Sequence, residues 1–398
     1  MIRIFLLSFA LVFGLTASAD VVDHTVGAQT AINDSLLFRG VQGNQELNRL
    51  LSKDLANCGW FDMVRSGVAN YIVSGNASGN SVQLELANGA GARITTVTAT
   101  GNSPETASKR AVDTLLNYLY RIPGICCSRI IFVAQTGPFQ KEIYMCDYDG
   151  TNVTQLTRNG GLSLDPLWVP GGRSIVYSFV GRTYSTLIEQ TVNAKRNRRL
   201  ARFTGLNAGG RISPDGEKVA LILSKDKQVD LYVRSVNGTE LRRLTNDRAV
   251  EASPSWSPDG KYICYVSDAG TGRPRLHMIP ANGGFAKRIP GALGSESVSP
   301  SWSKDGKIAY AARLGNYTVA VIDPSGKTPA RLTKQQYGPL NLGKGDWESP
   351  SWAPDNRHVV CSRDYGIYIV DTWKGTARQI LGGKSKLSLP DWSDILYF

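Results

Sequence analysis

The side chains that most often carry enzymatic chemistry are scarce in this chain and lack the spacing of a catalytic or metal-binding group. It has only three histidines, His24, His277 and His358. None belongs to an H-x-x-x-H or H-E-x-x-H pattern, and His277 and His358 lie in strand-like runs, where a structural role is expected. No G-x-S-x-G sequence is present that could form a nucleophile elbow. The sequence therefore predicts no catalytic residues, no bound metal and no cofactor.

The six cysteines leave their pairing open. Cys264 and Cys361 lie inside apolar strand patterns of different repeats, where cysteine most often serves as a small buried hydrophobe. For the neighbours Cys126 and Cys127, a disulfide to a partner such as Cys146 is an alternative, because an exported chain permits disulfides. The chain contains no C-x-x-C sequence, which leaves a thioredoxin-like motif or a zinc ribbon without support.

One pattern recurs through the C-terminal two thirds of the chain. Ser-Pro-Ser-Trp followed by a Pro-Asp-Gly-type turn stands at 253–260, 299–306 and 349–356, with weaker copies at 165–172 and 212–216. Each copy precedes a short apolar run, and the turns end at residues 172, 216, 260, 306 and 356. A period of about 40–50 residues built from short strands is typical of a β-propeller. The repeat therefore predicts a mainly β fold with four strands per repeat.

Counting the strand after each turn predicts six blades. These second strands are expected at 130–134, 174–179, 218–223, 262–267, 308–312 and 358–362. The first of them has no tryptophan-containing strand before it. Pro390-Asp391-Trp392-Ser393 supplies that strand from the other end of the chain, so we expect the ring to close through the C-terminus and remove its exposed sheet edges. The repeated tryptophans are then fillers between blades, and the repeated aspartates are turn residues.

The region before the repeats has a different pattern. Helical periodicity covers 44–57 and, after a Ser103 N-cap and Pro104, continues from there to about Tyr120. Strand-like runs cover 71–73, 82–86 and 94–98. These elements predict a small α/β domain over residues 35–125, followed by the six-bladed propeller over 126–398.

The N-terminus has the layout of a secretory signal peptide. Arg3 is followed by a 12-residue apolar run, which is too short to span a bilayer, and by the cleavage pattern Ala17-Ser18-Ala19. We expect a signal peptide over 1–19 and a flexible N-terminal segment over 20–34; a retained anchor is the alternative. Export implies a periplasmic protein that meets membranes only indirectly.

Positive charge is concentrated in the predicted propeller. The formal net charge is +12, and residues 20–128 hold eight Lys/Arg against nine Asp/Glu, so the excess lies in residues 129–398. Export argues against a nucleic-acid partner and leaves an acidic protein or an anionic surface. One basic residue lies in or beside each loop between second and third strands: Lys141, Arg182, Lys227, Arg273, Arg313 and Arg363. The loops between blades, on the same face, add Arg211, Arg248, Glu251, Trp347 and Glu348. This face is a candidate docking site for a partner, or its cations are simply solvated.

A known family combines these features. An α/β domain with Asp54-Leu55-x-x-x-Gly59-x-Phe61, a helix ending near Pro123-Gly124 and a propeller opening with Arg129-Ile130-Ile131-Phe132-Val133 occur here in the order found in the TolB family. The repeats alone also occur in propellers of prolyl-oligopeptidase-type enzymes. Together with the signal peptide, they make nearly the whole mature chain resemble TolB, the periplasmic propeller of the Tol-Pal envelope system.

The resemblance implies a function. Proteins of this family are non-enzymatic scaffolds: the propeller binds the peptidoglycan-associated lipoprotein Pal, and an N-terminal segment engages TolA. The complex supports outer-membrane integrity and envelope constriction during cell division. Here 20–34 occupies the place of that segment without a clear match to it. A monomer is expected.

Two alternatives belong to other functional classes. One is a propeller enzyme, a glycan lyase or hydrolase using Glu251, Glu296 and Glu348, although these residues stand at irregular offsets from the following proline. The other is an orphan propeller that binds a sugar or peptide ligand.

Overall fold

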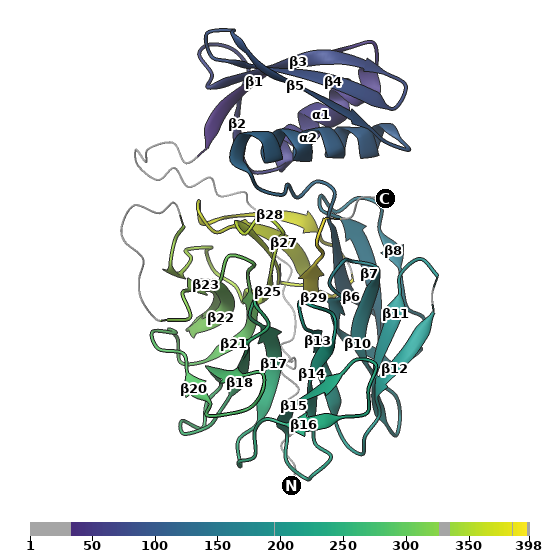
Figure 1. The fold of residues 1–398 in the computed structure, drawn as a ribbon, viewed down its shortest axis with the longest axis vertical. Helices are drawn as coiled ribbons and strands as arrows, with labels where there is room; N and C mark the ends of the chain where they lie inside the picture. The colour runs from purple at the N-terminus through teal and green to yellow at the C-terminus, as the bar shows by residue number, and fades with distance from the viewer. Residues whose placement is uncertain (1–32, 195, 326–334, 384, 396–398) are drawn as a thin grey trace.

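The computed structural model describes residues 33–194, 196–325, 335–383 and 385–395 (Figure 1). The expected signal peptide and all but the last two residues of the expected N-terminal segment lie outside these ranges. The described chain begins with an α/β domain, and a ring of antiparallel sheets follows it. No helix in the described ranges is long and apolar enough to cross a membrane.

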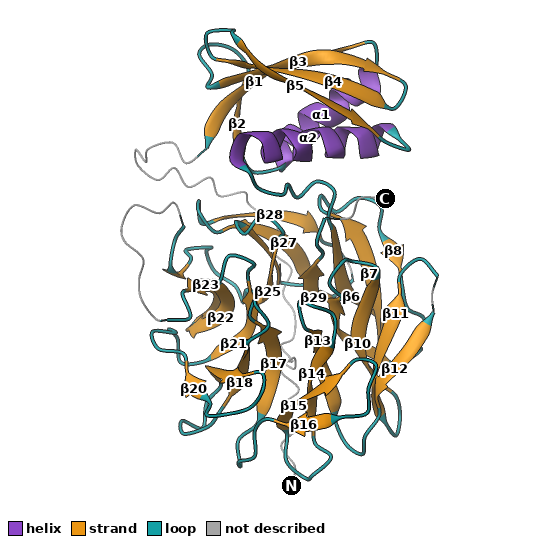
Figure 2. Cartoon of the chain, in the orientation of Figure 1, coloured by secondary structure: helices purple, strands orange, loops and turns teal. Residues whose placement is uncertain are grey.

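The α/β domain is a five-stranded sheet with strand order β2-β1-β3-β4-β5. Both helices pack on one face of this sheet (Figure 2). Asn44 and Ser103 accept hydrogen bonds from the first turns of the helices that follow them, as N-cap residues do. The elements are β1 (Asp34–Gln42), α1 (Gln45–Asn57), β2 (Phe61–Val64), β3 (Tyr71–Ser78), β4 (Ser81–Asn88), β5 (Arg93–Thr100) and α2 (Pro104–Tyr120).

Six four-stranded units form the propeller, and the predicted fold class is confirmed. We number the blades in chain order and give their strands from the axis outward. Blade 1 has β29 (Leu387–Trp392), β6 (Arg129–Gly137), β7 (Gln140–Asp147) and β8 (Thr154–Gln155). Blade 2 has β9 (Leu162–Trp168), β10 (Ser174–Val180), β11 (Ser185–Thr191) and β12 (Asn197–Ala201). Blade 3 has β13 (Asn207–Ile212), β14 (Lys218–Leu223), β15 (Asp230–Ser235) and β16 (Leu241–Arg243). Blade 4 has β17 (Glu251–Trp256), β18 (Tyr262–Ser267), β19 (Arg275–Pro280) and β20 (Lys287–Arg288). Blade 5 has β21 (Ser297–Trp302), β22 (Ile308–Leu314), β23 (Asn316–Ile322) and β24 (Gly338–Pro339). Blade 6 has β25 (Glu348–Trp352), β26 (His358–Arg363), β27 (Gly366–Asp371) and β28 (Thr376–Leu381).

The ring closes in blade 1, where the C-terminal strand β29 pairs antiparallel with β6, placing Trp392 opposite Ile130. The Trp392 indole Nε1 donates to Ser128 Oγ at 2.7 Å, and Arg129 N donates to Ser393 Oγ at 2.8 Å. The innermost strand of the first blade thus comes from the end of the chain.

Each innermost strand carries the same irregularity three residues before its tryptophan position. Ser253, Ser299 and Ser349 have φ values of 50°, 52° and 52° there, and Gly209 takes the equivalent place with φ 67°. The register of the first two strands shifts at this point, which marks a β-bulge. The recurring Ser-Pro-Ser-Trp sequence therefore encodes a bend in the innermost strand as well as a filler residue.

Hydrogen bonds from tryptophan backbones link neighbouring innermost strands. Trp302 N donates to Ser255 Oγ at 3.0 Å, and Trp352 N donates to Ser301 Oγ at 3.3 Å. In blade 1 an aspartate takes the serine's place, and Trp168 N donates to Asp391 Oδ2 at 2.8 Å. The side chains at the tryptophan positions pack against the preceding blade, as Trp256 does against blade 3. Repetition of these contacts makes the ring continuous.

Candidate partner-binding face

The two ends of the propeller carry different loops. The Pro-Asp-Gly turns and the turns between third and fourth strands lie at one end, which we call the docked end. The α/β domain lies on it over blades 1 and 6 (Figure 1). Lys53 of α1 pairs with Asp149 at 2.5 Å, and Lys374 pairs with Asp62 at 2.7 Å. The loops between second and third strands and those between blades lie at the opposite end, which we call the free end.

The contact between α/β domain and propeller depends on the residues that carried the family resemblance. Asp54 of α1 is buried and accepts hydrogen bonds from Ser108 Oγ of α2 at 2.6 Å and Tyr148 OH of the propeller at 2.7 Å. Gly59 has φ 77°, and a Cβ on it would lie 2.3 Å from His358 Nε2. A larger residue at 59 would separate the α/β domain from blade 6, so this motif serves docking.

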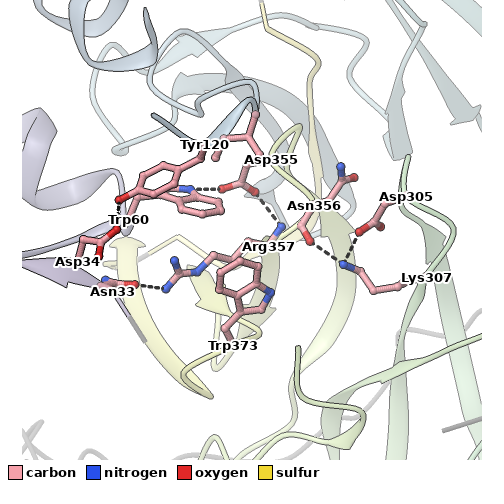
Figure 3. Close-up of a pocket in the computed structure, with 11 residues that line it drawn as sticks. Asn33, Asp34, Trp60, Tyr120, Asp305, Lys307, Asp355, Asn356, Arg357 and Trp373 are labelled. Carbon is pink, nitrogen blue, oxygen red and sulfur yellow. Dashed lines mark hydrogen bonds and ion pairs between the residues drawn. The ribbon is translucent and has the colours of Figure 1, made fainter. Parts of the chain in front are cut away.

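A cleft of about 370 Å³ lies beside this contact, between the α/β domain and blades 5 and 6 (Figure 3). Its lining residues are Asn33, Asp34, Trp60, Tyr120, Ile122, Asp305, Lys307, Asp355, Asn356, Arg357 and Trp373. Arg357 is fully buried between the rings of Trp60 and Trp373, with its guanidinium carbon 4.8 and 4.6 Å from their centroids. It binds Asp371 at 2.5 Å and Asn33 at 2.8 Å.

The imidazole of His358 completes this cluster. Its Nδ1 lies 2.6 Å from Asp355 Oδ2, and Trp60 Nε1 donates to the same oxygen at 3.0 Å. Burial alone would raise the pKa of Asp355, but His358 and two backbone N–H groups outweigh it and lower the pKa to about 2. The structural role expected of His358 therefore takes the form of a buried ion-pair cluster, which no local sequence pattern had indicated.

Most of the predicted basic residues lie exposed at the free end. Arg182, Lys227, Arg273 and Arg248 are exposed, and Lys141 and Arg363 are half-buried. Burial lowers the pKa of Lys141, and the nearby Lys386 lowers it further. Because these cations surround one end of the ring, that end attracts negative charge.

Two of the free-end cations have local partners. Arg313 is exposed and pairs with Glu296 at 2.9 Å. Arg363 pairs with Asp364 at 2.9 Å and lies 4.9 Å from the centroid of the Trp347 ring. These carboxylates offset part of the local charge, but most of the other cations remain available to a partner.

Three residues predicted at this face are placed differently. Arg211 points toward the axis and pairs with Asp391 of β29 at 3.3 Å, which ties blade 3 to blade 1. Trp347 is 1% exposed, because its loop is bonded to blade 5 through Trp347 N and the Tyr317 carbonyl (3.0 Å) and its ring packs edge-to-face on Tyr368 of blade 6. Glu251 is also 1% exposed and accepts from Ser267 Oγ at 3.0 Å. The Trp347 and Glu251 side chains are therefore not available to a docking partner, whereas Glu348 is exposed.

The carboxylates of the glycan-enzyme alternative have separate surroundings. Burial raises the pKa of Glu251 to about 8, Glu296 is paired with Arg313, and Glu348 faces solvent. No group of three His, Cys, Asp or Glu residues within the described ranges could hold a metal ion. All six cysteines are free thiols, so the structure contains no bond from Cys126 or Cys127 to Cys146.

Comparison with known proteins gives consistent matches. The family described as "TolB beta propeller domain" matches residues 117–396. The Tol-Pal system protein TolB of Anaeromyxobacter sp. (strain K) is 31% identical over 201 residues, which cover 50% of this chain and 46% of that protein. This chain thus spans about half the length of the curated relatives it matches.

Solved structures share the fold at lower identity. The crystal structure of TolB from Acinetobacter baumannii superposes with a TM-score of 0.81 at 20% identity and covers 92% of this chain and 97% of that chain. Hydrazine synthase of Kuenenia stuttgartiensis matches with a TM-score of 0.53 at 17% identity, covering 67% of this chain and 47% of that one. At these identities the likeness extends to the fold alone.

Proposed function

Because this chain belongs to the TolB family of Tol-Pal system proteins, we propose that it is a periplasmic protein-binding scaffold whose free end docks a Pal-like lipoprotein. TolB is a non-enzymatic component of the Tol-Pal system. That membership argues against the glycan-enzyme alternative. The same proposal gives the protein a role in outer-membrane integrity and in envelope constriction during division.

One observation carries the choice of surface. Both ends carry exposed cations, but the α/β domain covers blades 1 and 6 at the docked end. The free end therefore presents the uncovered face of the ring, where Arg182, Lys227, Arg248, Arg273 and Arg313 are exposed. A rigid ring of positive charge favours an acidic partner and accelerates its encounter. TolA is a second proposed partner, through the N-terminal segment 20–34, of which only Asn33 and Asp34 are described.

The test is the binding kinetics of the mature protein with the Pal-like lipoprotein of the same organism at two salt concentrations. Exposed charges contribute only about 0–1 kcal/mol each in direct pairs, so single substitutions should weaken binding modestly. The combined variant Arg182→Glu, Arg273→Glu and Arg313→Glu reverses the local field. We expect it to slow association about ten-fold or more at low salt. The difference should shrink as the salt rises, since screening acts over about 8–10 Å.

A matched control reverses three exposed cations at the docked end: Arg196→Glu, Lys261→Glu and Lys287→Glu. Both variants change the net charge equally, so only the location differs. We expect the control to associate nearly as fast as the unsubstituted protein. If the two variants slow association equally, net charge rather than the free end steers the partner, and the proposed docking surface is wrong.

A further inference from the structure

Exposed apolar side chains are distributed unevenly at the free end. Phe139 (84% exposed), Leu314 (56%) and Tyr365 (51%) stand at the hairpin tips of blades 1, 5 and 6. The corresponding loops of blades 3 and 4, residues 224–229 and 268–274, are fully described and present no exposed large apolar side chain. The free end therefore has one sector with exposed apolar tips and another whose tips are only polar.

The tips of the first sector are connected to one another. The carbonyl of Tyr365 accepts from Leu387 N of β29 at 3.2 Å, and Lys386 Nζ lies 5.0 Å from the centroid of the Tyr365 ring. The Lys386 carbonyl accepts from Gln135 N of β6 at 3.0 Å. Blades 6 and 1 thus form one continuous surface, and blade 5 follows directly on the other side of blade 6.

Leu293 extends this surface beside blade 5. It is also exposed, and its loop is held to the blade by bonds from Leu293 N to Tyr310 OH and from Ser295 N to the Arg313 carbonyl, both 2.9 Å. The exposed Tyr184 of blade 2 differs, because its ring packs edge-to-face against the Phe179 ring of its own blade in addition to its contact with the Arg202 guanidinium. Available apolar surface is therefore concentrated on blades 5, 6 and 1.

Large apolar side chains exposed together on a rigid scaffold mark interaction sites, and aromatic residues and arginine are enriched among those that dominate binding energy. We propose that the partner docks off the propeller axis, with Phe139, Leu314 and Tyr365 at the buried centre of the interface. Lys386, whose ammonium lies over the Tyr365 ring, supplies positive charge at this centre, and Arg313 and Arg363 add donors although Glu296 and Asp364 offset part of their charge. Together they favour an acidic protein surface with an apolar patch of its own. Lys227 and Arg273, on the polar sector, act only on the encounter. This inference rests on the proposed function, so the occupant is the Pal-like lipoprotein.

The two sectors predict different kinetic effects. Buried apolar anchors hold a formed complex and thus govern its dissociation, whereas distant charges change mainly the association rate. The variant Phe139→Ser, Leu314→Thr and Tyr365→Asn removes the anchors. Asn suits position 365, where φ is 64°. We expect dissociation to accelerate about ten-fold or more with association within about two-fold. The variant Lys227→Ser and Arg273→Ser should slow association at low salt and leave dissociation unchanged.

A matched control makes the same kind of change at the docked end: Phe285→Ser, Val153→Thr and Tyr262→Asn, all at exposed positions. This control should bind and dissociate at the rates of the unsubstituted protein. Circular dichroism melting curves should show that all variants fold. Faster dissociation of only the anchor variant supports the inference. If the polar-sector variant dissociates as fast as the anchor variant, docking is not off-axis. The same conclusion follows if the anchor variant binds and dissociates like the unsubstituted protein. Either result leaves the proposed partner in place. If the unsubstituted protein does not bind the lipoprotein, the proposed function fails, and this inference fails with it.

Discussion

Replacing Arg357 by methionine tests the contact between the α/β domain and the propeller. Arg357 is fully buried between two rings, one from each side of that contact: Trp60 belongs to the α/β domain and Trp373 to blade 6. Methionine keeps much of the apolar stem but removes both guanidinium bonds to Asp371, leaving His358 Nε2, 3.8 Å away, as the nearer potential cation. Removing one partner of a buried ion pair costs about 3–5 kcal/mol. Asp371 Oδ1 still accepts from the backbone N–H groups of Trp373 and Lys374, so we expect the lower end, about 3 kcal/mol.

The loss should depend on pH in a defined direction. Burial would raise the pKa of Asp371, but His358 and Arg357 outweigh it and lower the pKa below its ordinary value. A carboxylate with a depressed pKa in the folded state stabilises the fold above its unfolded pKa, about 3.9, and this contribution fades at lower pH. The difference between Arg357→Met and the unsubstituted protein should therefore shrink as the pH falls below about 4. Adding Asp371→Asn should recover part of the loss at neutral pH, because it removes the unpaired charge.

Urea unfolding followed by tryptophan fluorescence and by far-ultraviolet circular dichroism measures this effect. A fluorescence transition that precedes the dichroism transition would mean that the α/β domain separates before the propeller unfolds. Arg378→Met is the control, because Arg378 is half-buried and donates a long, 3.4 Å bond to the Asn57 carbonyl of the α/β domain, with no carboxylate bonded to it within the described residues. If Arg357→Met and Arg378→Met lose stability equally, the buried cluster does not hold the contact, and the reasoning is refuted.

Three further substitutions test the propeller. Trp392→Ala should lower the free energy of unfolding in urea by about 3–5 kcal/mol, because this buried indole closes the ring. A loss no larger than that of Phe285→Ala, at an exposed position, would contradict closure. Ser301→Ala should cost about 1 kcal/mol and speed hydrogen exchange at Trp352 N, which donates to the hydroxyl; unchanged exchange would count against that bond. Burial raises the pKa of Glu251 to about 8, whereas its pKa in the unfolded chain is about 4.3. The neutral acid therefore contributes its full stability below about pH 4.3, and this contribution is lost as the pH rises through 8. Glu251→Gln should therefore melt near the unsubstituted protein at pH 4 and above it at pH 9, and equal melting temperatures at both would contradict the shift.

Local features of the sequence account for what could be predicted. The tryptophan strands and their turns are short-range signals, so the second strands of all six blades fall where the repeats place them, from Ile130 in β6 to His358 in β26. The same kind of signal located both helices of the α/β domain. Its strands β1 and β2 were not predicted, because neither has a clear alternation of apolar and polar residues.

Burial and pairing across the ring could not be predicted. Trp347 stands between two acidic residues in a loop, which indicated exposure, yet Tyr368 and Arg363 cover it from the hairpin that follows. Arg211 meets Asp391, which is 180 residues away in sequence. These placements depend on which blades become neighbours, and no local spacing records that.

Ring closure by β29 has a consequence for the order of events during synthesis. The bond from Arg129 N to Ser393 Oγ joins residues 264 positions apart. Synthesis adds about 5–20 residues per second, so β6 exists for roughly 13–50 seconds before β29, its inner neighbour, has been made. During that time the apolar run Ile130–Val133 has one unpaired edge, which is open to wrong pairing with other chains. We therefore expect the yield of folded protein to depend on protection of the unfinished ring more than on the stability of the finished one.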